Sequence, residues 1–197
     1  MLIFIAKRYN GYTLAEQASM AIKAGCGWIQ ASLAGLSHEE AHSAMAEVVG
    51  MCREQGVILT IEDDTALATE LGVHGVYLTD ASANARAMRT QMGAEAIIGI
   101  AAASPSSVGT LAALDMDYVF LPAGTDAQNA TAFMATVRAS GAEIPVVSAG
   151  CDPADIPALL AAGVSGFALS LEDIKPEDDP VKAVSEILTT ISLCAGK

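Results

Sequence analysis

Cationic side chains are scarce in this sequence. Its 197 residues include ten Lys and Arg against 23 Asp and Glu, a formal net charge of −13. Because binding to nucleic acid or to an anionic membrane needs clustered cations, this composition argues against both as partners. Aromatic residues are also few, at 5%, whereas 52% of the chain is apolar. The excess of small apolar residues suits short helices packed closely on a sheet.

Paired cysteines and long hydrophobic runs are absent as well. Cys26, Cys52, Cys151 and Cys194 lie far apart and form no C-x-x-C pair, so we expect reduced, buried thiols. The first residues, MLIFIAKRYNG, hold only a short apolar run after Met1. That run is too short for a signal-peptide core or a membrane span. The sequence therefore predicts a cytoplasmic protein.

Short apolar runs alternate with helix-period segments along the chain. Each run is apolar nearly throughout, as expected for parallel strands buried on both faces. The candidate strands are residues 2–6, 28–31, 57–61, 75–78, 96–101, 117–121, 144–149 and 166–169. Strand–helix pairs in this number predict a (β/α)8 TIM barrel of near-minimal length, forming one domain over residues 1–197. An open doubly wound sheet is the alternative, but no G-x-G-x-x-G follows the first run.

Three junctions between a helix and a strand share a pattern with two glycines. They read AGCGWIQ at 24–30, LGVHGVYL at 71–78 and AGVSGFAL at 162–169. The first glycine suits a left-handed helix C-cap, and the second allows close passage into the strand.

The segment SHEEAH at 37–42 has two interpretations. As H-E-x-x-H, it would place His38 and His42 on one helix face as zinc ligands, with Glu39 as general base. As a capping box, Ser37 and Glu40 would satisfy backbone donors at a helix start. The extended protease pattern lacks its third ligand, and the remaining histidine lies just before the fourth strand, at the opposite end of the barrel. We therefore interpret the segment as a helix cap.

In a TIM barrel, functional residues lie on the loops that follow the strands. These loops carry Lys7 and Arg8 after the first strand and many carboxylates elsewhere, namely Glu62, Asp63, Asp64, Asp80, Asp152, Glu172 and Asp173. Two unit charges 4 Å apart interact by about 4 kcal/mol at an effective dielectric of about 20. Such an acidic rim would repel a free diphosphate unless a divalent cation lay between them.

Three stretches together resemble thiamine phosphate synthase and its relative, the thiazole tautomerase. They are residues 57–80, residues 96–121 and IPVVSAGCDPADIPALLAAGVSGFALS at 144–170. The resemblance covers most of the chain, from the second strand to the eighth. It implies a TIM barrel that joins a phosphorylated thiazole to a pyrimidine carried as its diphosphate, with Mg²⁺ as cofactor.

The resemblance also implies roles for particular residues. Gln30 stands where the family's Gln-x-Arg-x-Lys motif begins and would face the pyrimidine or the diphosphate. Asp63 matches a metal-binding carboxylate, and Asp80 is the carboxylate nearest to the second metal position. The backbone at Gly150–Cys151 and at Ser170–Leu171 would hold a phosphate.

Several positions depart from the family pattern. Ser32 and Ala34 replace the Arg and Lys of that motif, and Glu62 and Asp64 flank Asp63 where the family has Asn and Arg. The Ser-x-His after the fifth strand is Ala101–Ala103, and the Thr-x-Thr-Lys after the sixth is not recognisable. Compared with the family pattern, these loops have lost cationic and hydroxyl side chains, and they have kept or gained carboxylates.

Each candidate residue also has a structural interpretation. Asp64 or Asp80 could cap the helix that follows it, and Lys7 and Arg8, candidate phosphate ligands, could belong to a solvated loop. Cys151 invites a nucleophile, but no histidine is placed to activate it, and Asp152–Pro153 is typical of a helix start. Gly150 is the stronger candidate for an anion-binding turn, because we expect the seventh helix to start directly there and its N-terminus to favour an anion. Trp28 and Tyr77 are expected to pack in the core.

The leading hypothesis is a divergent relative of thiamine phosphate synthase that binds a small phosphorylated metabolite. The alternatives are a non-catalytic binding or regulatory relative that keeps the fold, and a different barrel enzyme, such as an isomerase using the acidic mouth. Whether the chain forms a homo-oligomer stays open.

Overall fold

The computed structural model describes residues 1–176 and 179–196. Within these residues, eight strands pair in sequence order in parallel, and β1 pairs with β8 to close the sheet. The prediction of a (β/α)8 TIM barrel is confirmed, and each strand ends within two residues of its predicted limits. The strands are β1 (Leu2–Ala6), β2 (Trp28–Ala31), β3 (Ile58–Glu62), β4 (Gly75–Leu78), β5 (Ile97–Ala101), β6 (Tyr118–Phe120), β7 (Val146–Ala149) and β8 (Gly166–Leu169).

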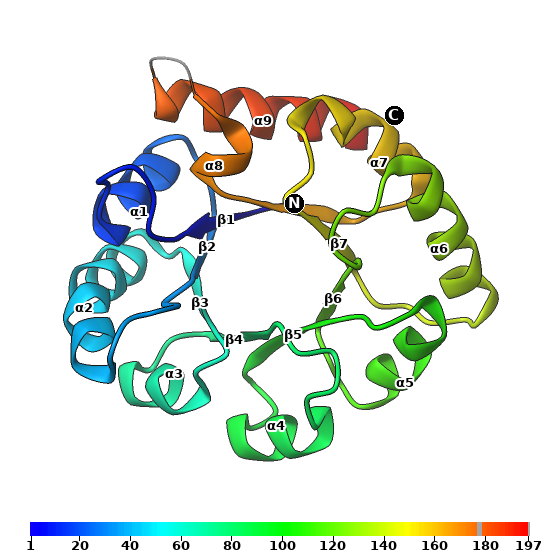
Figure 1. Ribbon diagram of the computed structural model, residues 1–197, viewed down its shortest axis with the longest axis horizontal. Helices are drawn as coiled ribbons and strands as arrows, with labels where there is room; N and C mark the ends of the chain where they lie inside the picture. Colours follow the sequence, from blue (N-terminus) through cyan, green and yellow to red (C-terminus); the bar gives the residue numbers. More distant parts are fainter. Residues whose placement is uncertain (177–178, 197) are drawn as a thin grey trace.

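Helices surround the barrel (Figure 1). α9 contacts α1 and α7 and completes the outer ring, whereas α8 lies inside it, near β1 and β8 (Figure 1). The helices are α1 (Leu14–Lys23), α2 (His38–Gln55), α3 (Thr65–Leu71), α4 (Ala85–Met92), α5 (Val108–Ala113), α6 (Ala127–Ala139), α7 (Ile156–Ala162), α8 (Leu171–Ile174) and α9 (Pro180–Ala195), with 3₁₀ turns η1 (Pro105–Ser107) and η2 (Pro153–Asp155).

The glycine junctions behave largely as predicted. Gly72 and Gly163 end α3 and α7 in the left-handed region, at φ values of 60° and 104°. Gly75 opens β4 so close to β5 that a Cβ placed on it would lie 1.8 Å from the carbonyl oxygen of Ile97. At the junction before β2, Gly27 has no such neighbour, since nothing lies within 4 Å of its Cβ position. Close passage is therefore required at Gly75 and not at Gly27.

Two separate hydrophobic layers hold the fold together. The larger one lies between the sheet and the helices, and the smaller one fills the barrel interior. The interior layer is partly aromatic: the Tyr118 ring lies 5.3 Å from Trp28, and the Tyr77 ring lies 4.1 Å from Phe120. A Cβ on Gly99 would lie 2.1 Å from the Tyr118 ring, so that glycine makes room for it. The prediction that Trp28 and Tyr77 are packing residues is confirmed.

Candidate functional site

The SHEEAH segment begins an outer helix. Ser37 is the N-cap of α2: its hydroxyl accepts from the Glu40 N–H at 3.3 Å, and a Glu40 carboxylate oxygen accepts from the Ser37 N–H at 2.8 Å. His38 and His42 each face Glu70 of α3, with Nε2–Oε separations of 3.3 and 3.5 Å. Among the described residues, no group of three or more potential ligands could hold a metal ion. The prediction of a helix cap is confirmed.

Asp63 directly follows β3 and adopts an unusual backbone conformation. Its φ of 55° lies in the left-handed region, which non-glycine residues rarely enter. Its carboxylate accepts hydrogen bonds from the Thr79 N–H at 2.8 Å and from the Thr79 hydroxyl. Because Thr79 follows β4, the neighbouring strand, the pairing of β3 with β4 orients this exposed carboxylate. Strained, oriented side chains of this kind cluster at functional sites.

Asp80 and Asp64 have local hydrogen-bond partners. The Asp80 carboxylate accepts from the N–H and the hydroxyl of Ser82 at 2.8 and 2.7 Å, and these bonds hold the Asp80 pKa below its usual value. Asn84, not Asp80, caps α4, so that suggested cap is wrong. Asp64 caps α3 by accepting from the Leu67 N–H at 2.8 Å, as predicted.

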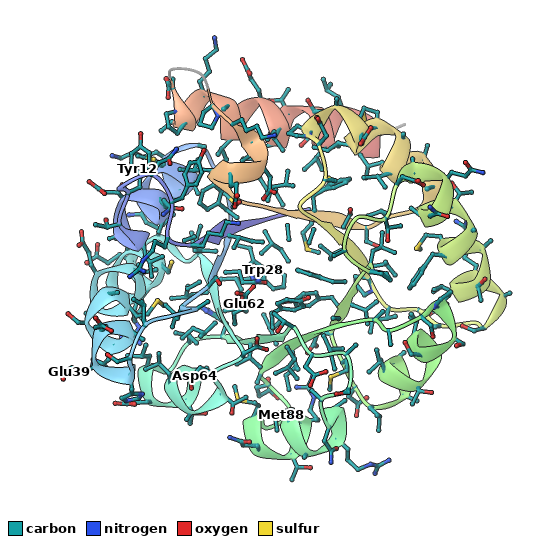
Figure 2. The ribbon with its side chains drawn as sticks, viewed as in Figure 1. Tyr12, Trp28, Glu39, Glu62, Asp64 and Met88 are labelled. Carbon is teal, nitrogen blue, oxygen red and sulfur yellow. The ribbon has the colours of Figure 1, made fainter. Side chains whose placement is uncertain are left out.

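Gln30 and Glu62 meet inside the mouth of the barrel (Glu62 is labelled in Figure 2). Gln30 Nε2 donates to a Glu62 carboxylate oxygen at 3.1 Å. Burial raises the pKa of Glu62 above its usual value of 4.5, hydrogen bonds from Ser32 and Gln30 oppose this, and the charge of Asp63 adds to it. The sequence placed Glu62 on the acidic rim but gave no sign of its contact with Gln30, because the two residues are 32 positions apart.

The raised pKa of Glu62 predicts a pH-dependent effect of Glu62→Gln on stability. A carboxyl whose pKa is higher in the folded state stabilises the fold at low pH and loses that contribution as pH rises through the folded-state pKa. Wild type and Glu62→Gln should therefore differ little at pH 4, and the variant should become relatively more stable towards neutral pH. Urea denaturation across this range measures the difference, with Glu54→Gln, at an exposed position of α2, as control. A difference that shrinks with rising pH would contradict the prediction.

The predicted phosphate turn lies between the ends of β7 and β8. Gly150 adopts a left-handed φ of 62°, but its N–H donates to the Ala168 carbonyl at 3.0 Å. The Ser170 N–H and hydroxyl donate to the Asp173 carboxylate at 2.8 and 2.7 Å. A Cβ on Gly150 would lie 3.4 Å from the same carboxylate. The structure thus brings Gly150 and Ser170 together around an acidic side chain, and Leu171, which is buried, opens α8 beside them.

Cys151 and the start of α7 differ from the simplest expectation. The Asp152 carboxylate accepts from the Ala154 N–H at 2.9 Å and begins the 3₁₀ turn η2, as the sequence predicted. α7 itself begins only at Ile156, so it does not start directly after Gly150. Burial raises the pKa of Cys151 to about 11. A thiol with that pKa is protonated at neutral pH and is a poor nucleophile.

Lys7 and Arg8, the two cationic residues after β1, lie in different surroundings. Lys7 Nζ lies 2.6 Å from the Glu172 carboxylate of α8, whereas Arg8 is exposed. Lys7 therefore joins Gly150 and Ser170 on the β7–β8–β1 side of the mouth. Asp63 and Asp80 lie on the β3–β4 side, across the ring.

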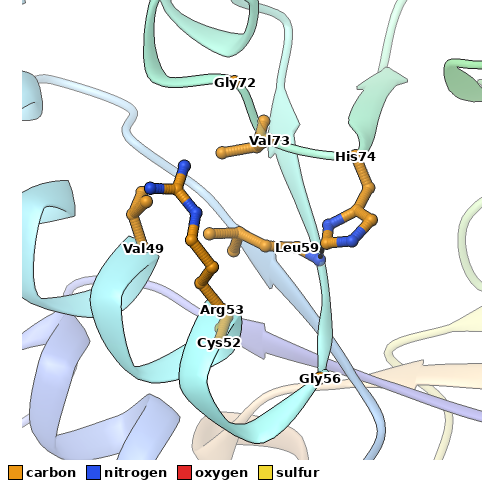
Figure 3. Close-up of a pocket in the computed structure, with 8 residues that line it drawn as sticks. All are labelled: Val49, Cys52, Arg53, Gly56, Leu59, Gly72, Val73 and His74. Carbon is orange, nitrogen blue, oxygen red and sulfur yellow. Dashed lines mark hydrogen bonds between the residues drawn. The ribbon is translucent and has the colours of Figure 1, made fainter.

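One cavity of about 300 Å³ lies at the mouth, between the segments that follow β2 and β3. Glu62, Asp63 and Asp64 line it on one side. A second cavity, of about 180 Å³, is lined by Arg53 and His74 (Figure 3). His74 precedes β4, and its Nδ1 accepts from the Leu59 N–H at 3.1 Å. This second cavity therefore lies at the opposite end of the barrel from the strand-end loops, as predicted for His74.

In the described part of the chain, no helix is both long and apolar enough to cross a membrane.

Comparisons with known proteins extend over nearly the whole barrel. The family model described as thiamine monophosphate synthase matches residues 2–172. Thiamine-phosphate synthase of Bacteroides fragilis is 32% identical, over 95% of this chain and 98% of its own. That of Bacteroides thetaiotaomicron is 30% identical, over 95% of both chains. Thiamine phosphate pyrophosphorylase from Pyrococcus furiosus superposes with a TM-score of 0.83 at 18% identity, covering 98% of this chain and 96% of that one.

Proposed function

This chain belongs to the thiamine monophosphate synthase family, and from that premise we propose that it works in thiamine biosynthesis as a transferase of the thiamine-phosphate synthase type. Its ligands are a thiazole phosphate and a pyrimidine diphosphate, bound at the mouth of the barrel. We place the protein in the cytoplasm, with small phosphorylated metabolites and not nucleic acid or membrane as its partners.

The observation that carries this proposal is the conformation of Asp63. A non-glycine residue at a φ of 55°, at the end of a barrel strand, is kept only where the surrounding structure fixes it. Both oxygens of its carboxylate are oriented by Thr79. That arrangement suits a side chain that must hold a ligand in one geometry.

The residues present fit Mg²⁺ if the substrate supplies part of its coordination. Mg²⁺ prefers oxygen ligands and is commonly held by one or two carboxylates together with waters and substrate phosphates. Asp63 can provide one carboxylate oxygen, with Asp80, in the loop that follows β4, as the second candidate. When bound, the cation would neutralise charge on the leaving diphosphate. Asp63 would hold that cation, and Gln30, which contacts the adjacent Glu62, lies on the inner side of the mouth.

A phosphate on the β7–β8 side would meet a site already occupied by acidic side chains. Glu172 pairs with Lys7, and Asp173 accepts from Ser170. An incoming phosphate must displace these carboxylates before Lys7 and the backbone at Gly150–Cys151 and Ser170–Leu171 can bind it. This competition is the specific observation that favours a second candidate function, a non-catalytic relative that keeps the barrel and binds other ligands.

Thermal unfolding with added ligands tests the proposal. Thiazole phosphate, thiamine phosphate and pyrophosphate are each added with and without Mg²⁺. A ligand at about 100 times its dissociation constant stabilises the fold by about 2.7 kcal/mol, which corresponds to about 5 to 10 °C in a chain of this size. We expect pyrophosphate to stabilise the protein only when Mg²⁺ is present.

Two controls make this result specific. Mg²⁺ alone and sulfate with Mg²⁺ should each give a smaller shift than pyrophosphate with Mg²⁺. A flat response to every ligand would reject the proposed function. Formation of thiamine phosphate from the two substrates then separates a transferase from a protein that only binds them.

A further inference from the structure

One polar side chain lies on the buried face of α1. The other buried residues of that helix are Leu14, Ala15, Ala18 and Ala21, whereas Gln17 is an amide at 0% exposure. Burial of an amide destabilises a fold unless its donors and its acceptor are paired. An apolar residue would fill the same space without needing partners, so the hydrogen bonds of Gln17 indicate its role.

Gln17 pairs with both backbone polar groups of Lys7. Its Nε2 donates to the Lys7 carbonyl oxygen at 2.6 Å, and its Oε1 accepts from the Lys7 N–H at 3.4 Å. The register of β1 with β2 ends at Ala6, one residue earlier. Gln17 therefore gives the first residue beyond β1 the kind of backbone contact that a neighbouring strand gives to the residues before it.

The same amide reaches the returning limb of the loop between β1 and α1. Gln17 Nε2 lies 3.4 Å from the carbonyl oxygen of Tyr12, which is labelled in Figure 2. At the tip of the loop, Asn10 and Gly11 have φ values of 44° and 78°, as in a type I′ turn. The Tyr12 N–H closes this turn by donating to the Tyr9 carbonyl at 2.9 Å. The loop is therefore fixed at its tip by the turn and at its base by Gln17.

The Lys7 side chain extends from this fixed backbone towards α8. Its Nζ lies 2.6 Å from the Glu172 carboxylate, and the side chain is 33% exposed. An ammonium group carries three N–H donors, so donors remain for a ligand while the contact with Glu172 is kept. Lysine side chains are flexible and lose rotamer freedom when they bind. A fixed backbone limits where this ammonium can lie before a ligand arrives.

We propose that Gln17 is a positioning residue: it holds the backbone of Lys7 so that the Lys7 ammonium meets an anionic group of the ligand on the β7–β8–β1 side of the mouth. Gln17 is fully buried and does not touch the ligand itself. The proposal rests on the proposed function in taking a phosphorylated compound as that ligand. It adds that a residue of the helix ring controls the place of a cation at the mouth.

The position of Lys7 can be measured without any ligand. NMR spectra of the full chain with carbon-labelled lysine show whether the Hε protons of Lys7 are inequivalent, as in a fixed side chain, or averaged. We expect them to be inequivalent in wild type and averaged in Gln17→Met, which keeps the side-chain length but removes the hydrogen bonds to Lys7. Averaged protons in wild type, or an unchanged Lys7 signal in Gln17→Met, would overturn the proposal.

Thr13→Ala is the matched control. It removes the N-cap side chain of the same helix, which destabilises the helix start, but it leaves the amide of Gln17 in place. The Hε protons of Lys7 should stay inequivalent in this variant. If Thr13→Ala averages them as fully as Gln17→Met does, general loosening of α1 and not Gln17 sets the position of Lys7, and the proposal is overturned.

Binding of pyrophosphate with Mg²⁺ then tests whether this position matters to a ligand. Isothermal titration calorimetry compares wild type, Lys7→Met, Gln17→Met and the double variant. We expect Lys7→Met to weaken binding by about tenfold, as for loss of one charge-assisted contact, and Gln17→Met by about three- to tenfold. Because Gln17 acts through Lys7, the double variant should bind no more weakly than Lys7→Met alone. Losses that add in the double variant would overturn the proposal.

These outcomes are separate from those of the proposed function. Mg²⁺-dependent binding of pyrophosphate that Gln17→Met does not weaken would reject the role of Gln17 alone. Averaging of the Lys7 signal in Gln17→Met but not in Thr13→Ala, with no response of wild type to any phosphorylated ligand, would reject the proposed function and leave the control of Lys7 by Gln17 standing.

Discussion

Alanine in place of Gly75 is expected to lower the free energy of unfolding by about 3 kcal/mol or more. The added Cβ would lie 1.8 Å from the Ile97 carbonyl oxygen and 2.6 Å from its carbonyl carbon. These are backbone atoms of β5, so they cannot rotate away as a side chain would. Relief requires β4 and β5 to separate at a point where Gly75 and Ile97 pair in register. Urea denaturation of the purified variant measures the loss.

Gly27→Ala is the matched control for this prediction. Gly27 occupies the same place in the repeated junction before β2, yet nothing lies within 4 Å of its Cβ position. Its φ is not in the positive range, so alanine suits its backbone. We expect this variant to change stability by less than about 1 kcal/mol. Similar losses for Gly27→Ala and Gly75→Ala would show that crowding against β5 is not the cause.

Asp63→Asn is expected to reduce Mg²⁺-dependent thiamine phosphate formation by about 100-fold or more, with the fold retained. Under the proposed function, Asp63 is a Mg²⁺ ligand. A metal ion contributes several kcal/mol of charge stabilisation to such chemistry, and a neutral amide is a weaker ligand for it than a carboxylate. Asparagine tolerates the left-handed backbone at this position and can still accept from Thr79. Rates measured over a range of Mg²⁺ concentrations should show a weaker dependence on the metal in the variant.

The variant Thr79→Val tests the orientation of the Asp63 carboxylate separately from its proposed role as a metal ligand. It removes the hydroxyl that donates to Asp63 but keeps the N–H that donates at 2.8 Å. Loss of a residue that orients a metal ligand typically costs about 10- to 100-fold in metal affinity or activity, so we expect a smaller effect than for Asp63→Asn. Full Mg²⁺-dependent activity in Asp63→Asn would show that Asp63 is not part of the site.

The barrel could be predicted from sequence because its signals are local. Continuous apolar runs mark strands buried on both faces, and the glycine junctions mark where helices end. The same local logic identified Ser37 as a helix cap and offered Asp64 and Asp80 as candidates, of which only Asp64 is a cap. It could not distinguish Gly27 from Gly75, because the crowding at Gly75 comes from a neighbouring strand.

The candidate site was predictable in its residue types but not in its contacts. Lys7 and Glu172 meet only because β8 closes against β1, and Asp63 meets Thr79 only because β3 pairs with β4. Partners that lie this far apart in the sequence cannot be recognised from local sequence patterns. The resemblance could therefore nominate Gly150 and Ser170 for a phosphate, but it could not show that Asp173 already occupies the Ser170 donors.

The pairing of β1 with β8 also matters while the protein is being made. The carbonyl of Met1 accepts from the Phe167 N–H, and the register of the two strands runs from Leu2 opposite Phe167. At about 5 to 20 residues per second of synthesis, β1 must wait about 10 to 30 s for its partner strand to emerge. During that interval the nascent sheet has an open edge that another chain could join. Closure of β1 against β8 removes this open edge, so the risk of edge pairing belongs to synthesis and folding.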